Sequence, residues 1–377
     1  MLKFKWSWLL PLMFFAVQGQ SQTLQGTVAD DSFLGPITNK TVYYSIYLPP
    51  GYETTAQRYP VIYHLHGRTA KYNGSQTTTV PPSFEAARDA GIIGPVIIVF
   101  PDGYASSMWA DSWGGAKPAE TNLVKELIPH VDSLYRTFAD REHRIVTGFS
   151  MGGFGVAKFA AKYPDLFRAG INYDGALHSW QTLNDIHPDI VREIFNDNET
   201  YFNQFSPWTF VAQNDSLLKT AVALRSVVGE LIQFNRPFRD TLQNRGIPLD
   251  YVETICDHSQ RCMLDEEGLN SAAFIANLLV TGIESSGTIP EDFLLYQNFP
   301  NPFNPGTTIR FNLRKSQPVT LKVFDVLGNE VAVLVNEKLP AGEQTVVLDG
   351  RTLSSGLYFY QLRTGQQTQA RRAVLLK

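Results

Sequence analysis

The stretch Gly148-Phe149-Ser150-Met151-Gly152-Gly153 follows the apolar run Ile145-Val146 and precedes the sequence FGVAKFAA at residues 154–161. This order predicts a strand, a sharp turn and a helix, with Ser150 held above the end of the strand. The three glycines remove Cβ atoms that would crowd the turn and the helix beside it. We therefore predict a nucleophile elbow with the pattern G-x-S-x-G. The alternative is a glycine-rich turn without a chemical role, and the strand and helix on either side favour the elbow.

Length and composition indicate more than one domain and argue against a nucleic-acid partner. With 377 residues, 44% of them hydrophobic and 18% charged, the chain can bury one large core and a second, small one. The net charge is −4, and the lysines and arginines are scattered along the sequence. Binding to nucleic acid needs a face dense in basic residues, so we expect no nucleic-acid partner.

Residues 1–21 have the features of a secretory signal peptide. Lys3 and Lys5 precede an apolar segment at residues 6–17, and small and polar residues follow at 19–21, where we expect cleavage. Since no other apolar run approaches the ~20 residues of a membrane helix, we expect no transmembrane segment in the mature chain. Export leads to an oxidising compartment, which favours a disulfide between Cys256 and Cys262 over two free thiols.

Two domains with a linker between them are expected after the signal peptide. Residues 22–281 alternate between strands and helices, which predicts an α/β domain with a mostly parallel sheet and an active site beyond the carboxyl ends of its strands. Residues 282–291 have a linker composition, and residues 292–377 contain short alternating runs typical of a small all-β sandwich. The expected strands of the α/β domain cover residues 42–48, 61–67, 96–100, 144–147, 169–173, 224–228 and 249–254, and those of the sandwich cover 308–313, 319–326, 331–335, 344–348, 357–362 and 370–376.

A serine hydroxyl needs a histidine base and an acid that orients this base. In an α/β-hydrolase sheet, the acid and then the histidine follow the serine along the chain. His258 follows the last expected strand of the α/β domain and is the expected base. Glu230 follows the strand 224–228 and is the expected acid. Asp215 is the rival, since its local sequence also suits an acid-bearing turn, although it precedes that strand.

Two backbone N–H groups are expected to stabilise the oxyanion that forms when the serine attacks a carbonyl. One belongs to Met151, the residue after the nucleophile. The other belongs to Arg68, in the loop after the strand 61–67, where Gly67 allows the chain to bend.

Two tryptophan-containing segments follow strand ends and are candidates for substrate binding. The candidate residues are Trp109, Asp111, Ser112, Trp113, His178 and Trp180. Flat aromatic faces beside polar groups suit an aromatic acyl group or a sugar ring. The alternative is that these residues pack a lid over the sheet. No group of residues has the spacing of a metal site, and we expect neither a metal nor a cofactor.

Six short segments carry a resemblance to a known family: LPPGY at 48–52, LHG at 65–67, PDG at 101–103, GFSMGG at 148–153, YPDLF at 163–167 and DH at 257–258. By these segments, residues 24–279 resemble the esterase D-like family, and within it the feruloyl and acetylxylan esterases of carbohydrate esterase family one. The resemblance implies that Ser150 is the nucleophile, His258 the base and Arg68 the second oxyanion residue.

The chain departs from this family pattern at two places. The family usually has an aspartate a few residues beyond the glycine of the acid strand, whereas here Glu230 directly follows Gly229. The family also has a glycine before the histidine, where this chain has Cys256 and Asp257. The first departure weakens the assignment of Glu230 as the acid.

The last 90 residues or so resemble the C-terminal sorting domain of the type IX secretion system. The resemblance rests on NFPNPFNP at 298–305, VFDVLG at 323–328, GLYFY at 356–360 and VLLK at 374–377. It implies a protein exported through the periplasm, carried by this secretion machinery across an outer membrane, and then released or attached to the cell surface. A carbohydrate-binding β-sandwich is the alternative for the same residues.

The sequence thus predicts a secreted serine carboxylester hydrolase that forms an acyl-enzyme. The expected substrates are feruloyl or acetyl esters of plant cell-wall polysaccharide. A general short-chain or siderophore esterase is one alternative. A catalytically silent surface-binding protein that retains the fold is another, from a different class.

Overall fold

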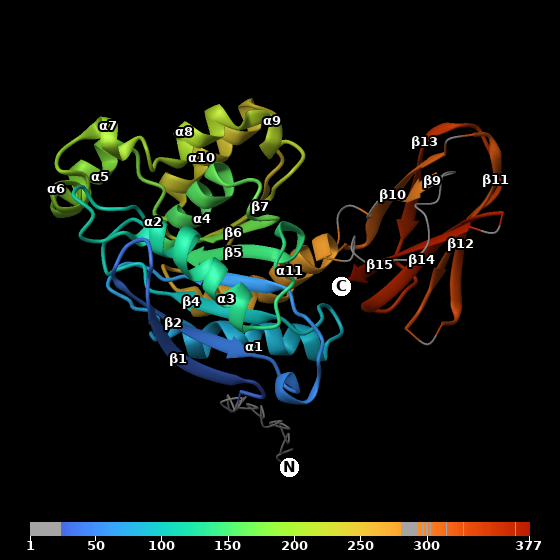
Figure 1. Cartoon of the computed structure of the whole chain (residues 1–377). Helices are drawn as coiled ribbons and strands as arrows, with labels where there is room; N and C mark the ends of the chain where they lie inside the picture. Colours follow the sequence, from blue (N-terminus) through green and yellow to red (C-terminus); the bar gives the residue numbers. More distant parts are fainter. Residues whose placement is uncertain are drawn as a thin grey trace, which may run out of the picture.

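The computed structural model describes residues 24–279, 293–295, 298, 301, 303–313, 315–326, 328–365 and 367–377. Its helices and strands form two groups, at residues 27–279 and 293–375 (Figure 1). The expected signal peptide and linker, at 1–21 and 282–291, lie outside the described residues. Within the described parts, none of the helices combines the length and hydropathy needed to cross a membrane.

An eight-stranded sheet forms the centre of the first group, in the order β1-β2-β4-β3-β5-β6-β7-β8. The strands β1 and β2 pair antiparallel with each other, and β2 pairs antiparallel with β4, whereas the remaining neighbours are parallel. The predicted mostly parallel sheet is therefore confirmed. The strands are β1 (Thr27–Leu34), β2 (Thr41–Leu48), β3 (Val61–Leu65), β4 (Ile97–Pro101), β5 (Arg144–Phe149), β6 (Ala169–Tyr173), β7 (Ala223–Val228) and β8 (Asp250–Glu253).

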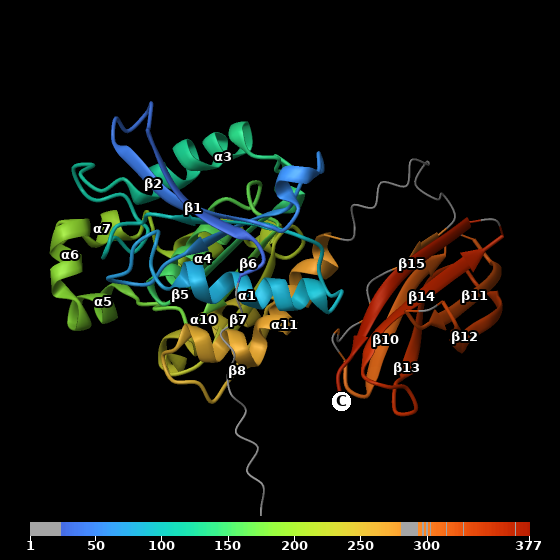
Figure 2. The ribbon, with the colours of Figure 1, turned by 90° about the horizontal axis from the view of Figure 1, so that it is seen from below.

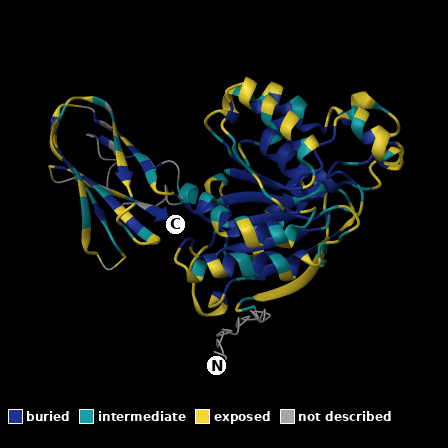
Figure 3. Ribbon diagram, turned by 180° about the vertical axis from the view of Figure 1, so that it is seen from behind, coloured by how far each residue is buried: buried dark blue, intermediate teal, exposed yellow. Residues whose placement is uncertain are grey.

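Helices cover both faces of this sheet, which is why the central strands are apolar throughout. Every residue of β3, β4 and β6 is buried. The helices α1 (Gln76–Asp89) and α11 (Gln260–Leu279) pack against each other on one face (Figure 2). The core of the other face includes α3 (Ile128–Leu134), α4 (Met151–Lys162) and α10 (Ile232–Asn244). Figure 3 shows the buried strands between helices whose outer surfaces are exposed.

The remaining helical segments are short and lie mainly between β6 and β7. Residues 178–213, between β6 and β7, form a series of short helices. Pro188 begins a new helix directly after the previous one ends, and Asn196, with φ 54°, ends it. The short segments are η1 (Tyr52–Thr54), α2 (Ala119–Thr121), the π-helical η2 (Asn122–Leu127), η3 (Arg141–His143), α5 (Trp180–Ile186), α6 (Pro188–Phe195), α7 (Glu199–Phe202), α8 (Pro207–Gln213) and α9 (Asp215–Leu218).

The second group is a small β-sandwich, as predicted. One sheet has the order β13-β10-β9 and the other β12-β11-β14-β15, all antiparallel. Side chains from both sheets share one core, which includes Phe311, Leu321 and Tyr360. The strands are β9 (Phe293–Leu295), β10 (Gly306–Leu313), β11 (Gln317–Phe324), β12 (Glu330–Leu339), β13 (Gly342–Asp349), β14 (Gly356–Thr364) and β15 (Gln367–Leu375).

The register of the parallel strands brings their carboxyl ends to one edge of the large sheet. Leu65 of β3 pairs with Gly148 of β5, Phe149 of β5 with Tyr173 of β6, and Tyr173 with Val227 of β7. The residues that follow these strands therefore meet at the same edge, where ligands bind in open parallel sheets.

Candidate active site

Ser150 lies at the turn between β5 and α4 with a strained backbone, at φ 58° and ψ −117°. A Cβ on Gly148 would lie 2.6 Å from the carbonyl oxygen of Gly152, and a Cβ on Gly152 would lie 2.0 Å from the carbonyl oxygen of Leu65. No side chain fits at either position without a shift of the backbone. The turn thus has the geometry of a nucleophile elbow, and its glycines are required by close backbone packing.

Ser150 is the first member of a chain of hydrogen bonds. Its Oγ lies 2.8 Å from His258 Nε2, and His258 Nδ1 lies 2.7 Å from Asp174 Oδ2. A carboxylate only accepts hydrogen bonds, so Nδ1 carries the proton and Nε2 is left to accept from the serine hydroxyl. This tautomer is the one in which a histidine can remove the serine proton.

Asp174 is fully buried directly after β6, with a left-handed backbone at φ 45°. Its Oδ1 accepts hydrogen bonds from the backbone N–H groups of Gly229, at 2.9 Å, and Leu231, at 3.0 Å. These two donors come from the turn after the neighbouring strand β7. They hold the carboxylate so that its second oxygen faces His258.

The prediction that Glu230 orients the imidazole is therefore wrong in its geometry. Glu230 is exposed, and its Oε2 accepts from the backbone N–H of His258 at 3.1 Å, not from the ring. The chain turns at Gly229 into α10, which directs the Glu230 side chain outward, while Asp174 occupies the ring's Nδ1 side. Asp215, the rival, lies in α9 and pairs with Lys219 Nζ at 2.9 Å.

Sequence reasoning missed Asp174 although a signal for it was present. The residue directly follows the strand 169–173, next to the strand that carries the serine, and Gly175 comes after it. Side chains after neighbouring parallel strands meet at one edge, so Asp174 deserved the same consideration as Glu230.

The loop that carries His258 is fixed on two sides. Cys256 and Cys262 form a disulfide around it, as predicted. The Phe149 ring stacks on the imidazole with ring centres 4.5 Å apart. The carboxylate of Glu266 lies within 4.8 Å of both sulfurs, but disulfide sulfurs are not thiolates, so this cluster is unsuited to bind a metal ion.

The two expected oxyanion donors also lie beside Ser150. Met151 begins α4, and the first N–H groups of a helix have no partner within the helix. On the other side, a Cβ on Gly67 would lie 3.3 Å from the Ser150 Cβ. Arg68 follows in the same loop, so both predicted residues are next to the nucleophile.

His66 fixes the peptide between Gly67 and Arg68. Its Nε2 accepts from the Gly103 N–H at 2.9 Å, so its protonated Nδ1 donates to the Gly67 carbonyl oxygen at 2.8 Å. In a trans peptide the carbonyl and the following N–H point in opposite directions. The Arg68 N–H therefore points away from His66. This role of His66 depends on contacts between separate loops, which no local sequence pattern indicates.

Three of the predicted substrate-binding residues instead hold the loop after β4. Trp109 is fully buried and donates from Nε1 to the His66 carbonyl oxygen at 3.2 Å, so the prediction that it faces substrate is wrong. The Asp111 carboxylate accepts from the N–H of Thr121 at 3.0 Å and from its hydroxyl at 2.6 Å. Ser112 is buried, and its Oγ accepts from the backbone N–H of Lys117 at 2.9 Å.

The other three candidates have more varied surroundings. Trp113 is 49% exposed and packs edge-on against Tyr201. Trp180 begins α5 and packs on Phe202. His178 is buried, which lowers its pKa to about 4. Contact of these three with a substrate stays a prediction.

A cleft of about 390 Å³ is lined in part by Phe149 and Ser259, the sequence neighbours of Ser150 and His258. Its lining comes from the loop after β3, the start of α1 and the loop that carries His258. The lining residues are His66, Gly67, Arg68, Ala70, Ser75, Gln76, Thr78, Thr79, Phe149, Ser259, Gln260 and Arg261. The lining thus includes the sequence neighbours of the serine and of the histidine, together with the expected oxyanion residue Arg68.

Two regions of this chain match family models. Residues 35–184 match the Esterase family, described as "Putative esterase". This region is similar to the Esterase family. Residues 297–376 match the family described as "Secretion system C-terminal sorting domain". The chain therefore combines a region similar to this family with a tail that supports export to the cell surface or beyond.

Curated relatives match part of this chain. Esterase Rv1288 of Mycobacterium tuberculosis (strain H37Rv) is 35% identical over 134 residues, which are 35% of this chain and 28% of the relative. The endo-1,4-beta-xylanase/feruloyl esterase of Xylanibacter ruminicola is 29% identical over 182 residues, which are 45% of this chain and 24% of the relative. The chain thus spans about a quarter of the length of these relatives.

Solved structures share the fold of the first group. A ferulic acid esterase has a TM-score of 0.59 and 21% identity, covering 68% of this chain and 100% of that one. The S-formylglutathione hydrolase of Agrobacterium tumefaciens has a TM-score of 0.55 and 14% identity, covering 68% of this chain and 97% of that one. At these identities the likeness establishes an α/β-hydrolase fold.

Proposed function

We propose that this protein is a serine carboxylester hydrolase that works through an acyl-enzyme. The observation that carries the proposal is the continuous hydrogen-bond chain from Ser150 through His258 to the buried Asp174. A silent surface-binding protein would have no need to keep this geometry. Asp174 also supplies an acid in a chain that lacks the aspartate that the family usually has after the glycine of the acid strand.

The first half of the reaction follows from this chain. Ser150 Oγ attacks the ester carbonyl carbon while His258 Nε2 takes the hydroxyl proton. Asp174 stabilises the imidazolium that forms. The N–H groups of Met151 and Arg68 donate to the oxyanion, and each such donor contributes about 10²–10³ in rate. The tetrahedral intermediate then collapses, the alcohol leaves with the proton from His258, and the acyl group remains on Ser150.

The second half regenerates the enzyme. Water enters the place of the alcohol, and His258 removes its proton as it attacks the acyl carbon. The same oxyanion donors stabilise the second tetrahedral intermediate. Its collapse returns the proton to Ser150 Oγ and releases the carboxylic acid. No cofactor takes part in these steps.

Feruloyl or acetyl esters of plant cell-wall polysaccharide are the substrates that we favour. The relative from Xylanibacter ruminicola carries feruloyl esterase in its name, and the sorting tail suits an enzyme that meets a polymer outside the cell. We further propose export by a signal peptide at residues 1–21, passage through the periplasm and transport by the type IX secretion machinery, which recognises the C-terminal sandwich.

Hydrolysis of methyl ferulate and of p-nitrophenyl acetate by the full chain tests the proposal, with Ser150→Ala as the control. We expect the native chain to hydrolyse both esters, with the higher kcat/KM for ferulate, and Ser150→Ala to be inactive. Folded native chain that hydrolyses neither ester, or equal activity of Ser150→Ala, would refute it. Activity on acetate alone would assign a deacetylase or a general short-chain esterase instead.

A further inference from the structure

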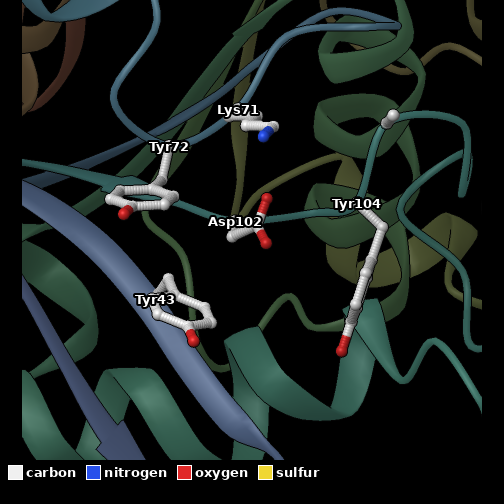
Figure 4. A pocket seen from close by; sticks show the side chains of 6 residues that line it. Tyr43, Lys71, Tyr72, Asp102 and Tyr104 are labelled. Carbon is white, nitrogen blue, oxygen red and sulfur yellow. The ribbon is translucent and has the colours of Figure 1, made fainter.

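A second pocket, of about 350 Å³, lies beside the loop that follows β3. Its lining comes from β2, from that loop and from the loop after β4, and consists of Tyr43, Lys71, Tyr72, Asp102, Tyr104 and Ala105. In Figure 4, Tyr43 and Tyr72 lie on one side of the pocket and Tyr104 on the other, with Asp102 between them. The site chemistry described above uses none of these residues.

Apart from the Tyr104 hydroxyl, the polar side-chain atoms of this pocket have no hydrogen-bond partner among the described residues. The Asp102 carboxylate lies 3.7 Å from His66 Nε2, but that nitrogen accepts the Gly103 N–H and has no proton to give. Among the residues that the structure describes, no group donates a hydrogen bond to this carboxylate. Within the same described set, Lys71 Nζ and the hydroxyls of Tyr43 and Tyr72 also lack hydrogen-bond partners.

The walls are nevertheless held in place. The rings of Tyr43 and Tyr72 stack with centres 5.7 Å apart. The Asp102 N–H donates to the Tyr43 carbonyl oxygen at 3.0 Å, and the Tyr104 hydroxyl accepts from Asn122 Nδ2 at 3.3 Å. The pocket is therefore formed before any ligand arrives, which lowers the entropy cost of binding.

We propose that this pocket binds one ring of a neutral saccharide. The C–H face of a sugar packs on flat aromatic rings, while its hydroxyls both donate and accept hydrogen bonds. The pocket offers both kinds of surface: three tyrosine rings, a carboxylate that accepts and an ammonium that donates. A wholly apolar ligand would bury these charged groups without partners, which is unfavourable. The opposite charges of Lys71 and Asp102 give no net preference for a charged ligand.

The pocket is close enough to Ser150 to act on the same polymer. Lys71 is four residues beyond Gly67, whose Cα adjoins the nucleophile, and four residues span at most about 14 Å. The Thr69 N–H donates to the Ala105 carbonyl oxygen at 2.7 Å, which ties the two loops together. Given the proposed esterase function, on which this step rests, the pocket binds the alcohol side of the substrate a few sugar units from the ester.

Binding of unesterified oligosaccharides to the full native chain tests the inference, because these ligands are not consumed. The probes are xylohexaose and cellohexaose, measured by isothermal titration calorimetry. We expect at least one of them to bind, and we expect Tyr43→Ala and the isosteric Asp102→Asn each to weaken this binding about tenfold. Tyr43 is 42% exposed, so its truncation leaves the core intact. Tyr251→Ala, the same change in β8 at the opposite edge of the sheet, is the matched control and leaves the affinity unchanged.

Several results would overturn the inference. The first is that neither oligosaccharide binds. The second is that Tyr43→Ala and Asp102→Asn bind the oligosaccharides as tightly as the native chain does. The third is that these two variants weaken the binding of ferulate but not of the sugars. Hydrolysis of p-nitrophenyl acetate by the native chain tests the esterase proposal separately. An active chain without sugar binding refutes the pocket alone. An inactive chain with Tyr43-dependent sugar binding refutes the esterase proposal and supports the pocket as a saccharide site.

Discussion

Replacement of Asp174 by asparagine tests which carboxylate serves the histidine. In the native chain, Asp174 Oδ1 accepts from two backbone N–H groups, and Oδ2 accepts from His258 Nδ1 at 2.7 Å. An asparagine in the same position keeps its amide oxygen on the two backbone donors, because its NH₂ cannot accept from them. The NH₂ group then faces His258 Nδ1 and donates to it.

This exchange of donor and acceptor reverses the histidine tautomer. With Nδ1 as acceptor, the proton moves to Nε2, which then donates to Ser150 Oγ and can no longer remove its proton. The fold and the distances stay almost unchanged while the base is lost. A change of tautomer of this kind costs about 10⁴ in kcat, equivalent to roughly 5 kcal/mol in the activation barrier.

The assay is the steady-state hydrolysis of p-nitrophenyl acetate at neutral pH, with Glu230→Gln as the matched control. Among the described residues, Glu230 accepts one hydrogen bond, from the backbone N–H of His258. A glutamine can accept the same bond, so we expect kcat of Glu230→Gln to change less than tenfold. The reasoning is refuted if Asp174→Asn keeps kcat within tenfold of the native value, or if Glu230→Gln shows the large loss instead.

Three further predictions concern stability. Lys158 is fully buried and pairs with Glu120 at 2.7 Å, so Lys158→Met leaves a buried carboxylate short of one partner. We expect the free energy of unfolding, measured by urea titration, to fall by about 3–5 kcal/mol. A loss below about 1 kcal/mol would contradict this. Burial lowers the pKa of His64 to about 3, so below pH 6.5 this group takes up a proton when the chain unfolds. Its contribution to the stability of the folded chain is therefore complete above pH 6.5 and is lost as the pH falls toward 3. Between pH 7 and 5 this effect removes about 2 kcal/mol of stability, and His64→Gln should show a correspondingly smaller decrease; equal decreases in both chains would exclude it. Replacement of both Cys256 and Cys262 by serine opens a short loop, with a sequence separation of 6, and lowers the free energy of unfolding by about 2 kcal/mol. We also expect a lower kcat, because the loop of His258 loses the disulfide that fixes it. An unchanged free energy of unfolding and an unchanged kcat would show that the disulfide is dispensable.

The large sheet was predictable because its central strands are buried on both faces. Continuous apolar runs identify such strands, and β6 covers the same residues, 169–173, that the sequence indicated. Helix starts were harder to place. The last helix of the domain begins at Gln260, and its first turns, with the sequence QRCMLDEEG, are rich in polar residues.

The site was predictable as far as local sequence determines it. Ser150 and His258 follow strands and are brought together as expected. The acid depends on how β6 and β7 align, because the turn after Gly229 supplies the donors that hold Asp174, and no local pattern records this alignment. Trp109 was misjudged for a similar reason. Gly103 and Gly155 leave room for its ring, since a Cβ on either would lie within 3 Å of it, and this packing joins distant parts of the chain.

Reaction with a fluorophosphonate probe tests the central claim most directly. The full native chain and Ser150→Ala are incubated with the probe at neutral pH and analysed by intact-mass and peptide mass spectrometry. The account predicts a single stoichiometric adduct on Ser150 and none in Ser150→Ala, because only a serine activated by its histidine attacks the phosphorus. A folded native chain without an adduct at Ser150, or with its adduct on another residue, would contradict the account.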